Sequence, residues 1–302
     1  MSIRPVIVHH KGNLDNLKYP PNSLEAVRAS LEAGADCVEV DILALAAGDY
    51  LVVHDELLET ETTGSGPVMA CTPEQARTLY IRWHDEEEDN PERYPVPLLS
   101  EVVALLEAYP GKTRLQLDFK NFIPFASDEP LRRLVELVRP LGERVIVTSC
   151  ADWQLRRLRR LAPWLDLGFD ILFYLDWRDP NREYDSRLPP FRESSYGYFD
   201  DHLLAVGQSW PVRDYLADRC EVLARQVPGA SALYINHALL IQSLDDGFNW
   251  AEALASMGMQ TVAWTLDADN SRHMAHTFRL YENGVRQFTS NTPLALAGLL
   301  GR

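Results

Sequence analysis

Gly34-Ala35-Asp36-Cys37-Val38-Glu39-Val40-Asp41-Ile42 is the stretch that decides the fold of this 302-residue chain. A glycine that can end a helix is followed by an apolar run typical of a strand. Glu39 and Asp41 stand two residues apart, so both carboxylates project from one face of that strand. Buried carboxylates need a cation or a base to neutralise them, and their oxygens suit Mg²⁺ or Ca²⁺. The alternative is the solvent-facing side of an edge strand.

Similar short apolar runs recur along the chain, separated by amphipathic helical stretches. They lie at residues 6–8, 37–42, 114–118, 145–148, 167–172, 232–235, 261–264 and 286–289. Eight strands alternating with helices predict an α/β fold, a (β/α)₈ or TIM barrel. A ninth run at residues 50–53 follows the second strand too closely for a helix to intervene, so it predicts an extra hairpin strand. No linker divides the chain, which predicts a single domain over residues 1–302.

The helix before the second strand has signals at both of its ends. Asn22 or Ser23 can cap its start, and Glu25 stands three residues after Asn22, as in a capping box. Gly34 follows the last apolar residue of the helical pattern and fits a C-terminal cap. The helix is therefore expected to end just before the second strand begins.

Two stretches do not fit the repeating unit. Half of residues 84–95 are acidic, which predicts a solvated surface loop. Residues 174–211 contain prolines and many aromatic side chains and predict a long loop insertion after a strand. Loops that follow barrel strands lie at the carboxyl-terminal mouth, where active sites form, so this insertion is expected beside the site. A structural flap is the alternative.

The composition fits a soluble globular protein and disfavours some partners. The formal net charge of −15 argues against a broad basic face for nucleic acid or an anionic membrane. No apolar run is long enough to form a transmembrane segment, and the N-terminus has no apolar signal region, so a cytoplasmic location is expected. The four cysteines are widely spaced, which predicts reduced structural thiols. The composition does not give the oligomeric state.

Two further groups of residues can carry chemistry. Asp118 ends the run at 114–118 and Lys120 stands two residues later, so the two side chains share a face. This pattern indicates a salt bridge or, beside a metal, a phosphate-binding lysine. His10 and His54 stand at the ends of apolar runs, and two histidines at one barrel mouth favour acid–base chemistry near neutral pH.

The order of these motifs resembles the glycerophosphodiester phosphodiesterase family, whose barrel also resembles phosphatidylinositol phosphodiesterases. The family pattern runs H-R-G, P-E-N-T, G-A-D-x-x-E-x-D, V-x-H-D, P-L-L-x-E, E-x-K, W-T-x-N/D and T-D-x-P. The corresponding segments here are residues 10–12, 20–23, 34–41, 52–55, 97–101, 118–120, 264–267 and 290–293. The resemblance runs from the first strand to the last, and residues 174–231 have no matching motif.

The chain departs from the family pattern at several positions. Lys11 and Pro21 replace an Arg and a Glu that are expected to pair, so local positioning should change while the metal ligands are kept. Asp118 stands where Glu is usual and is one methylene shorter. Asn291 replaces the Asp of T-D-x-P. His9 is an additional histidine, expected to point away from the site because adjacent strand residues alternate faces.

The resemblance implies a metal-dependent hydrolase that converts a glycerophosphodiester to an alcohol and glycerol phosphate. It implies His10 and His54 as acid and base, Lys120 on the phosphate, and Trp264 as a pocket wall or a plain core residue. It also implies a divalent Mg²⁺ or Ca²⁺ held by Glu39, Asp41 and Asp118, and a small-molecule phosphodiester of lipid metabolism as substrate. A phospholipase D-like cyclising phosphotransferase on choline or ethanolamine lipids remains an alternative, as does a non-catalytic binder on the same scaffold.

Overall fold

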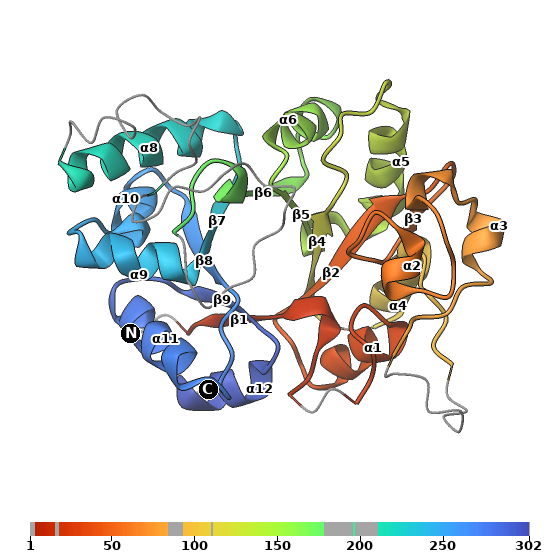
Figure 1. The fold of residues 1–302 in the computed structure, drawn as a ribbon, viewed down its shortest axis with the longest axis horizontal. Coiled ribbons are helices and arrows are strands. Elements are labelled where there is room, and N and C mark those ends of the chain that lie inside the picture. Colours follow the sequence, from red (N-terminus) through yellow and green to blue (C-terminus); the bar gives the residue numbers. More distant parts are fainter. Residues whose placement is uncertain are drawn as a thin grey trace.

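The computed structural model describes residues 4–15, 18–83, 93–109, 111–177, 196 and 211–301. Eight parallel strands close into a barrel because β1, the first strand, pairs with β2 on one side and with β9, the last strand, on the other (Figure 1). Around the ring the barrel strands are β1 (Val6–His9), β2 (Cys37–Ala44), β4 (Arg114–Phe119), β5 (Val145–Ser149), β6 (Asp166–Asp170), β7 (Ala232–Asn236), β8 (Gln260–Trp264) and β9 (Gln287–Ser290). The predicted (β/α)₈ barrel is confirmed.

Helices pack around the outside of the barrel, as Figure 1 shows. They are α1 (Leu24–Glu32), α4 (Leu99–Ala108), α5 (Glu129–Val138), α6 (Asp152–Leu161), α8 (Val212–Gln226), α9 (His237–Asp245), α10 (Trp250–Ser256), α11 (Ser271–Glu282) and α12 (Pro293–Leu299). Val38, Val40 and Ile42 on β2 are buried in the main core, together with the apolar faces of these helices. The alternate residues of β2 therefore face the inside of the barrel.

The extra strand is also confirmed, and it belongs to a larger excursion. β3 (Tyr50–Leu51) pairs antiparallel with the end of β2. The chain then forms α2 (Leu58–Glu61), η2 (Val68–Ala70) and α3 (Pro73–Ala76) before it returns to α4. This excursion has its own small core, in which Leu43, Leu51, Val68 and Leu98 are almost fully buried. It positions the loop that carries His54 at the barrel mouth.

The first helix shows where the sequence prediction was right and where it was wrong. Ser23 is the N-cap, and its side chain accepts a hydrogen bond from Ala26 N–H. Asn22 does not form the expected capping box, because its backbone is left-handed (φ 64°) and its amide is used elsewhere. Gly34 follows the helix with φ 75°, as a C-terminal glycine cap requires.

Tyr234 fills the inside of the barrel below the mouth. Its hydroxyl donates to Gln116 Oε1 at 3.0 Å. A Cβ at Gly168 on the neighbouring strand would lie 2.3 Å from the Tyr234 ring, so only glycine fits there. The barrel centre is thus a packed floor, and the open space lies above it.

Several sequence predictions fall on particular segments. The strand predicted at 167–172 ends at Asp170, and Ile171–Phe173 form a 3₁₀ turn, η4. Most of the predicted loop insertion at 174–211 and of the acidic loop at 84–95 lies outside the described residues. The four cysteines are free and buried, as expected. Among the helices of the described segments, none is both long and apolar enough to cross a membrane.

Candidate active site

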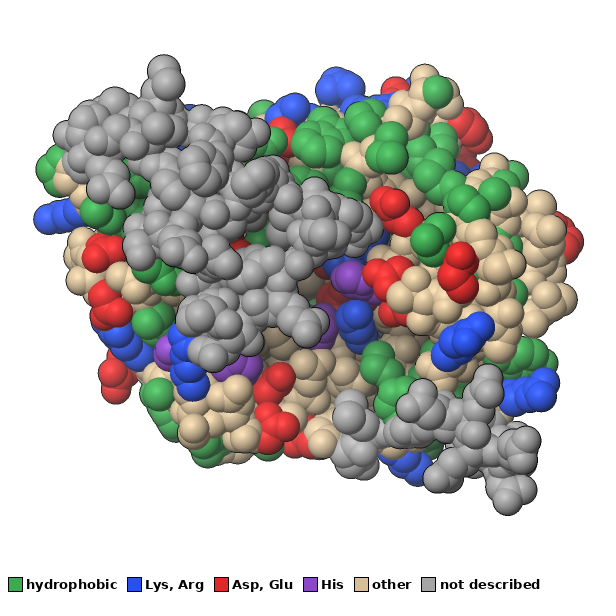
Figure 2. Space-filling model, viewed as in Figure 1, with side chains coloured by type: hydrophobic (Ala, Val, Ile, Leu, Met, Phe, Trp, Pro, Cys, Tyr) green, Lys and Arg blue, Asp and Glu red, His purple; other side chains and the backbone are tan. Residues whose placement is uncertain are grey.

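A pocket of about 360 Å³ opens at the carboxyl-terminal mouth of the barrel. The predicted residues that line it are His10, Glu39, His54, Asp118, Lys120 and Trp264. In Figure 2, histidine, lysine and acidic side chains gather in a hollow at the middle of this face. Sequence positions from the first strand to the eighth therefore meet in one place, as expected of a barrel active site.

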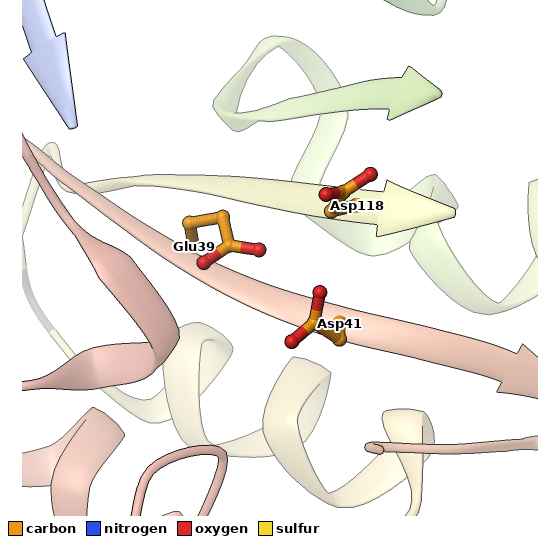
Figure 3. Close-up of side chains that lie close together, drawn as sticks. All are labelled: Glu39, Asp41 and Asp118. Carbon is orange, nitrogen blue, oxygen red and sulfur yellow. The ribbon is translucent and has the colours of Figure 1, made fainter. Parts of the chain in front are cut away.

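Strand register brings three carboxylates together. Asp41 on β2 is the parallel partner of Asp118 on β4, and Glu39 faces the same way two residues earlier. One oxygen from each of Glu39, Asp41 and Asp118 lies within 4.8 Å of the others, and Figure 3 shows the three side chains converging. Burial, together with the charges of Asp41 and Asp118, raises the pKa of Glu39 well above its usual value.

Asp41 is held from two sides. The Asn22 amide donates to its Oδ2 at 3.0 Å, and its backbone N–H donates to Asn22 Oδ1 at 3.1 Å. The ammonium of Lys11 lies 3.1 Å from Oδ2 and that of Lys120 lies 3.2 Å from Oδ1. Burial alone would raise the pKa of Asp41, but the two lysines hold it well below its usual range.

This cluster has the chemistry of a site for a hard divalent cation. The Oδ1 of Asp41 is buried and accepts no hydrogen bond among the described residues; it faces the Lys120 ammonium at 3.2 Å, and a remaining lone pair can serve a ligand. All three side chains offer carboxylate oxygens, which Mg²⁺ and Ca²⁺ prefer. Asp118 is the more open member, since its side chain is 26% exposed, and it stands at the pocket wall. The residues present therefore fit such an ion.

Lys120 stands directly after β4 and belongs to the same cluster. Its Nζ donates to Asp118 Oδ2 at 2.7 Å. Burial would lower the pKa of Lys120, but Asp118 and Asp41 raise it well above the usual value, so the side chain stays charged. Because it also lines the pocket, its ammonium can meet an anionic ligand there.

His10 contacts the side-chain amide of Asn291. Asn291 Oδ1 lies 2.8 Å from His10 Nδ1, and Asn291 Nδ2 donates to Asp267, which fixes the amide orientation. His10 Nδ1 must therefore carry the hydrogen, and in the neutral ring Nε2 has the free lone pair. Nε2 lies 4.0 Å from Glu39 Oε2, on the side of the carboxylate cluster. Burial and the nearby Lys11 lower the pKa of His10, which favours this neutral form.

His54 has a different partner. Its Nδ1 lies 2.9 Å from Asp55 Oδ1, and its backbone N–H donates to Glu61 Oε2 at 2.7 Å. His54 thus faces a carboxylate oxygen at Nδ1, whereas His10 faces an amide oxygen there. The two histidines therefore stand in unlike surroundings at one pocket.

The remaining predicted positions can be placed as well. Trp264 lines the pocket from the end of β8. His9 points away, as expected: it is buried, and its Nδ1 lies 3.0 Å from Ser30 Oγ on α1. The aromatic side chains expected over the mouth at 178–195 and 197–210 lie outside the described residues.

Sequence reasoning missed three contributors to the site. It gave Asn22 only a capping role, and it treated Asn291 as a departure without a partner. The third is Asp170, at the end of β6: it lines the pocket, and burial with the nearby Asp118 raises its pKa to about 7. The signal for the two asparagines was present, because both fall inside the quoted motifs.

The fold and the site together define a barrel protein with a carboxylate cluster and two histidines at its mouth. The model of the glycerophosphoryl diester phosphodiesterase family matches residues 10–186. This chain belongs to that family.

Known relatives agree with this assignment. The human glycerophosphodiester phosphodiesterase 1 is 34% identical over 264 residues, which cover 86% of this chain and 71% of the human one. A glycerophosphodiester phosphodiesterase of Caldanaerobacter subterraneus is 27% identical over 166 residues, 55% of this chain. That match spans 66% of the bacterial protein, just under two thirds of its length.

Solved structures share the fold. An Oleispira antarctica phosphodiesterase, solved in complex with its product sn-glycerol-3-phosphate, superposes with a TM-score of 0.65. The superposition covers 99% of this chain and 98% of the other, at 16% identity. At that identity the likeness establishes the barrel alone.

Proposed function

We propose that this protein hydrolyses a glycerophosphodiester to an alcohol and glycerol phosphate, using a divalent cation held by Glu39, Asp41 and Asp118. The observation that carries the proposal is the convergence of these carboxylates beside His10 and His54 at one pocket. Family membership supports the substrate class, as do the names of the relatives and the product bound to the Oleispira antarctica protein. Mg²⁺ and Ca²⁺ are the proposed ions, because the donor set consists of oxygens.

The different hydrogen-bond partners of the two histidines support different roles for them, one as general base and the other as general acid. His10 is the general base in this proposal, because its neutral form has a free lone pair on Nε2, and it takes the proton of the attacking oxygen. His54 is the general acid in this proposal: the Asp55 carboxylate at Nδ1 holds its ring in place, and His54 gives a proton to the departing alcohol oxygen. When the attacking oxygen is a neighbouring hydroxyl of the glycerol, its new P–O bond forms as the P–O bond to the alcohol breaks, and the product is a cyclic phosphate. Water then opens this cyclic phosphate: His54 takes the proton of the water and His10 returns its proton to the glycerol oxygen, so both rings regain their starting states. When water attacks the diester directly, the two rings regain their starting states by proton exchange with solvent.

The cations of the pocket serve the phosphate group. Lys120 is proposed to hold a non-bridging phosphate oxygen by a charge-assisted hydrogen bond. A bound divalent ion would stabilise negative charge on the phosphate oxygens as the diester is cleaved. Trp264 is proposed to wall the pocket on the β8 side.

One observation favours a second function. The third carboxylate is Asp118, where the family pattern has Glu, and phospholipase D-like cyclising relatives can have Asp there. Such a protein would release choline or ethanolamine from a lipid and leave a cyclic phosphate. The nature of the phosphate product distinguishes the two functions.

A turnover assay tests the proposal. Purified protein is incubated with glycerophosphocholine and with bis(p-nitrophenyl) phosphate, with Mg²⁺ or Ca²⁺ and then with a chelator. We expect turnover of glycerophosphocholine that needs the ion and is lost in His10→Ala and His54→Ala. Binding of the diester without any turnover would instead indicate a non-catalytic binder.

A further inference from the structure

Lys11 reaches the carboxylate cluster with both its backbone and its side chain. It lies in the 3₁₀ turn η1 (His10–Gly12), directly after β1, in a left-handed conformation (φ 55°, ψ 27°). Its N–H donates to Glu39 Oε2 at 2.7 Å, and its Nζ lies 3.1 Å from Asp41 Oδ2. One residue thus contacts two of the three carboxylates that we propose as cation ligands.

The contact with Asp41 matters because the carboxylate is buried. Asp41 is 1% exposed and the Lys11 side chain 19%, so solvent screens this ion pair only weakly. Asn22 occupies the same Oδ2 at 3.0 Å. A second ammonium, that of Lys120, stands at Oδ1. The three carboxylates and the two lysines leave one net negative charge when all are ionised.

Lys11 has no alternative acidic partner in the motif that follows. Position 21, where the motif has Glu, is Pro21. The acidic groups that Lys11 contacts are Asp41, through Nζ, and Glu39, through its backbone N–H. Its ammonium is therefore committed to the carboxylate cluster.

We infer that Lys11 is a built-in competitor of the divalent cation: its ammonium neutralises Asp41 in the metal-free protein and so weakens cation binding. This inference rests on the proposed cation site. Lys11 is a positioning residue in this role, acting through Asp41. Without an ion, Lys11 stabilises the carboxylate cluster by pairing with Asp41. A divalent ion must displace this pairing in order to bind Asp41, so it binds more weakly.

Calorimetric titration with Mg²⁺ and with Ca²⁺ tests the inference without any assay of activity. Lys11→Met and Lys11→Gln remove the charge, Lys11→Arg keeps it, and Lys112→Met removes an exposed charge elsewhere. We expect both neutral variants to bind the ion at least about tenfold more tightly than the wild type, about 1.4 kcal/mol. Lys11→Arg and Lys112→Met should stay within roughly threefold, far below what a lost buried pair produces.

Melting temperatures provide a second readout. Without ion, Lys11→Met and Lys11→Gln should melt below the wild type, and saturating ion should raise their melting temperature more than that of the wild type. Equal or weaker cation binding by the neutral variants would overturn the inference while leaving the cation site intact. Failure of both to fold even at saturating ion would also overturn it, because Lys11 would then serve the fold itself. If neither the wild type nor the neutral variants bind an ion, the proposed cation site itself is wrong.

Discussion

Asp41 on β2 and Asp118 on β4 are register partners, side by side at the carboxyl end of the barrel. Because both face inward, the hydrogen-bond ladder itself fixes the spacing of two of the three carboxylates. Glu39 joins them because it lies on the same face of β2. The proposed site is thus built on rigid strands, and the acid–base groups stand on the loops around it.

Glu39→Gln should remove turnover without harming the fold. The raised pKa of Glu39 means that its ionised form destabilises the metal-free protein at neutral pH. The amide keeps an oxygen for Lys11 N–H and removes that charge. We expect turnover to fall at least roughly 10²-fold, since metal ligation supplies several kcal/mol, and the melting temperature to stay level or rise. Parallel assays of activity and thermal unfolding test this; a large loss of stability would contradict it.

Asp41→Asn should behave in the opposite way. Asp41 is the buried counter-ion of Lys11 and Lys120, so its loss leaves buried ammonium groups with fewer partners. We expect the free energy of unfolding to fall on the order of 3 kcal/mol, as when one partner of a buried ion pair is removed. Urea unfolding of the metal-free protein measures this, with Glu39→Gln as the matched control. Equal stability of the two variants would count against the ion pairs.

His10→Ala and His54→Ala should each lower the rate at least roughly 10²-fold, the usual contribution of a general acid or base. His9→Ala should lower the melting temperature, because it loses the contact with Ser30, yet leave the pH dependence of the rate in place. Steady-state kinetics of the three variants decide this. Retained activity in His10→Ala with loss in His9→Ala would show that His9, and not His10, takes part in the acid–base chemistry.

Asn291→Asp should move the pH profile. Burial and Lys11 lower the pKa of His10, so the base is neutral, and active, down to mildly acidic pH. A carboxylate in place of the Asn291 amide stabilises the protonated ring and raises the pKa of His10. The acidic limb of kcat/KM should therefore shift to higher pH, with activity lost earlier as the pH falls. Asn291→Ala is the control, because it removes the amide without adding charge, and an unshifted limb in Asn291→Asp would reject His10 as the base.

The sequence predicted the barrel well because each strand can be recognised from its own short stretch of residues. β-Branched runs such as Val145–Ser149 need no tertiary information to be recognised, and Glu39 and Asp41 share a face by the period of a strand alone. The contact between Asp41 and Asp118 depends on inter-strand register, which composition and periodicity do not determine. It could be expected only through the resemblance of the motifs.

The asparagines show a second limit. An asparagine before a helix is a good cap, and Asn22 was read in that way. The same amide can bind a carboxylate, and the left-handed backbone at Asn22 turns it toward Asp41. His10 and Asn291 lie at opposite ends of the chain, so their hydrogen bond follows from the closure of β1 against β9. Such contacts become visible only once the barrel is closed.

Phosphorus NMR of the products from glycerophosphocholine tests the central claim most directly. With Mg²⁺ or Ca²⁺ present, we expect the diester signal to be replaced by that of glycerol phosphate, an open phosphomonoester, and we expect a chelator to stop the reaction. Conversion that continues unchanged in the chelator would contradict the cation site formed by Glu39, Asp41 and Asp118. A cyclic phosphate that accumulates, with no monoester on prolonged incubation, would contradict hydrolysis and make the protein a cyclising phosphotransferase.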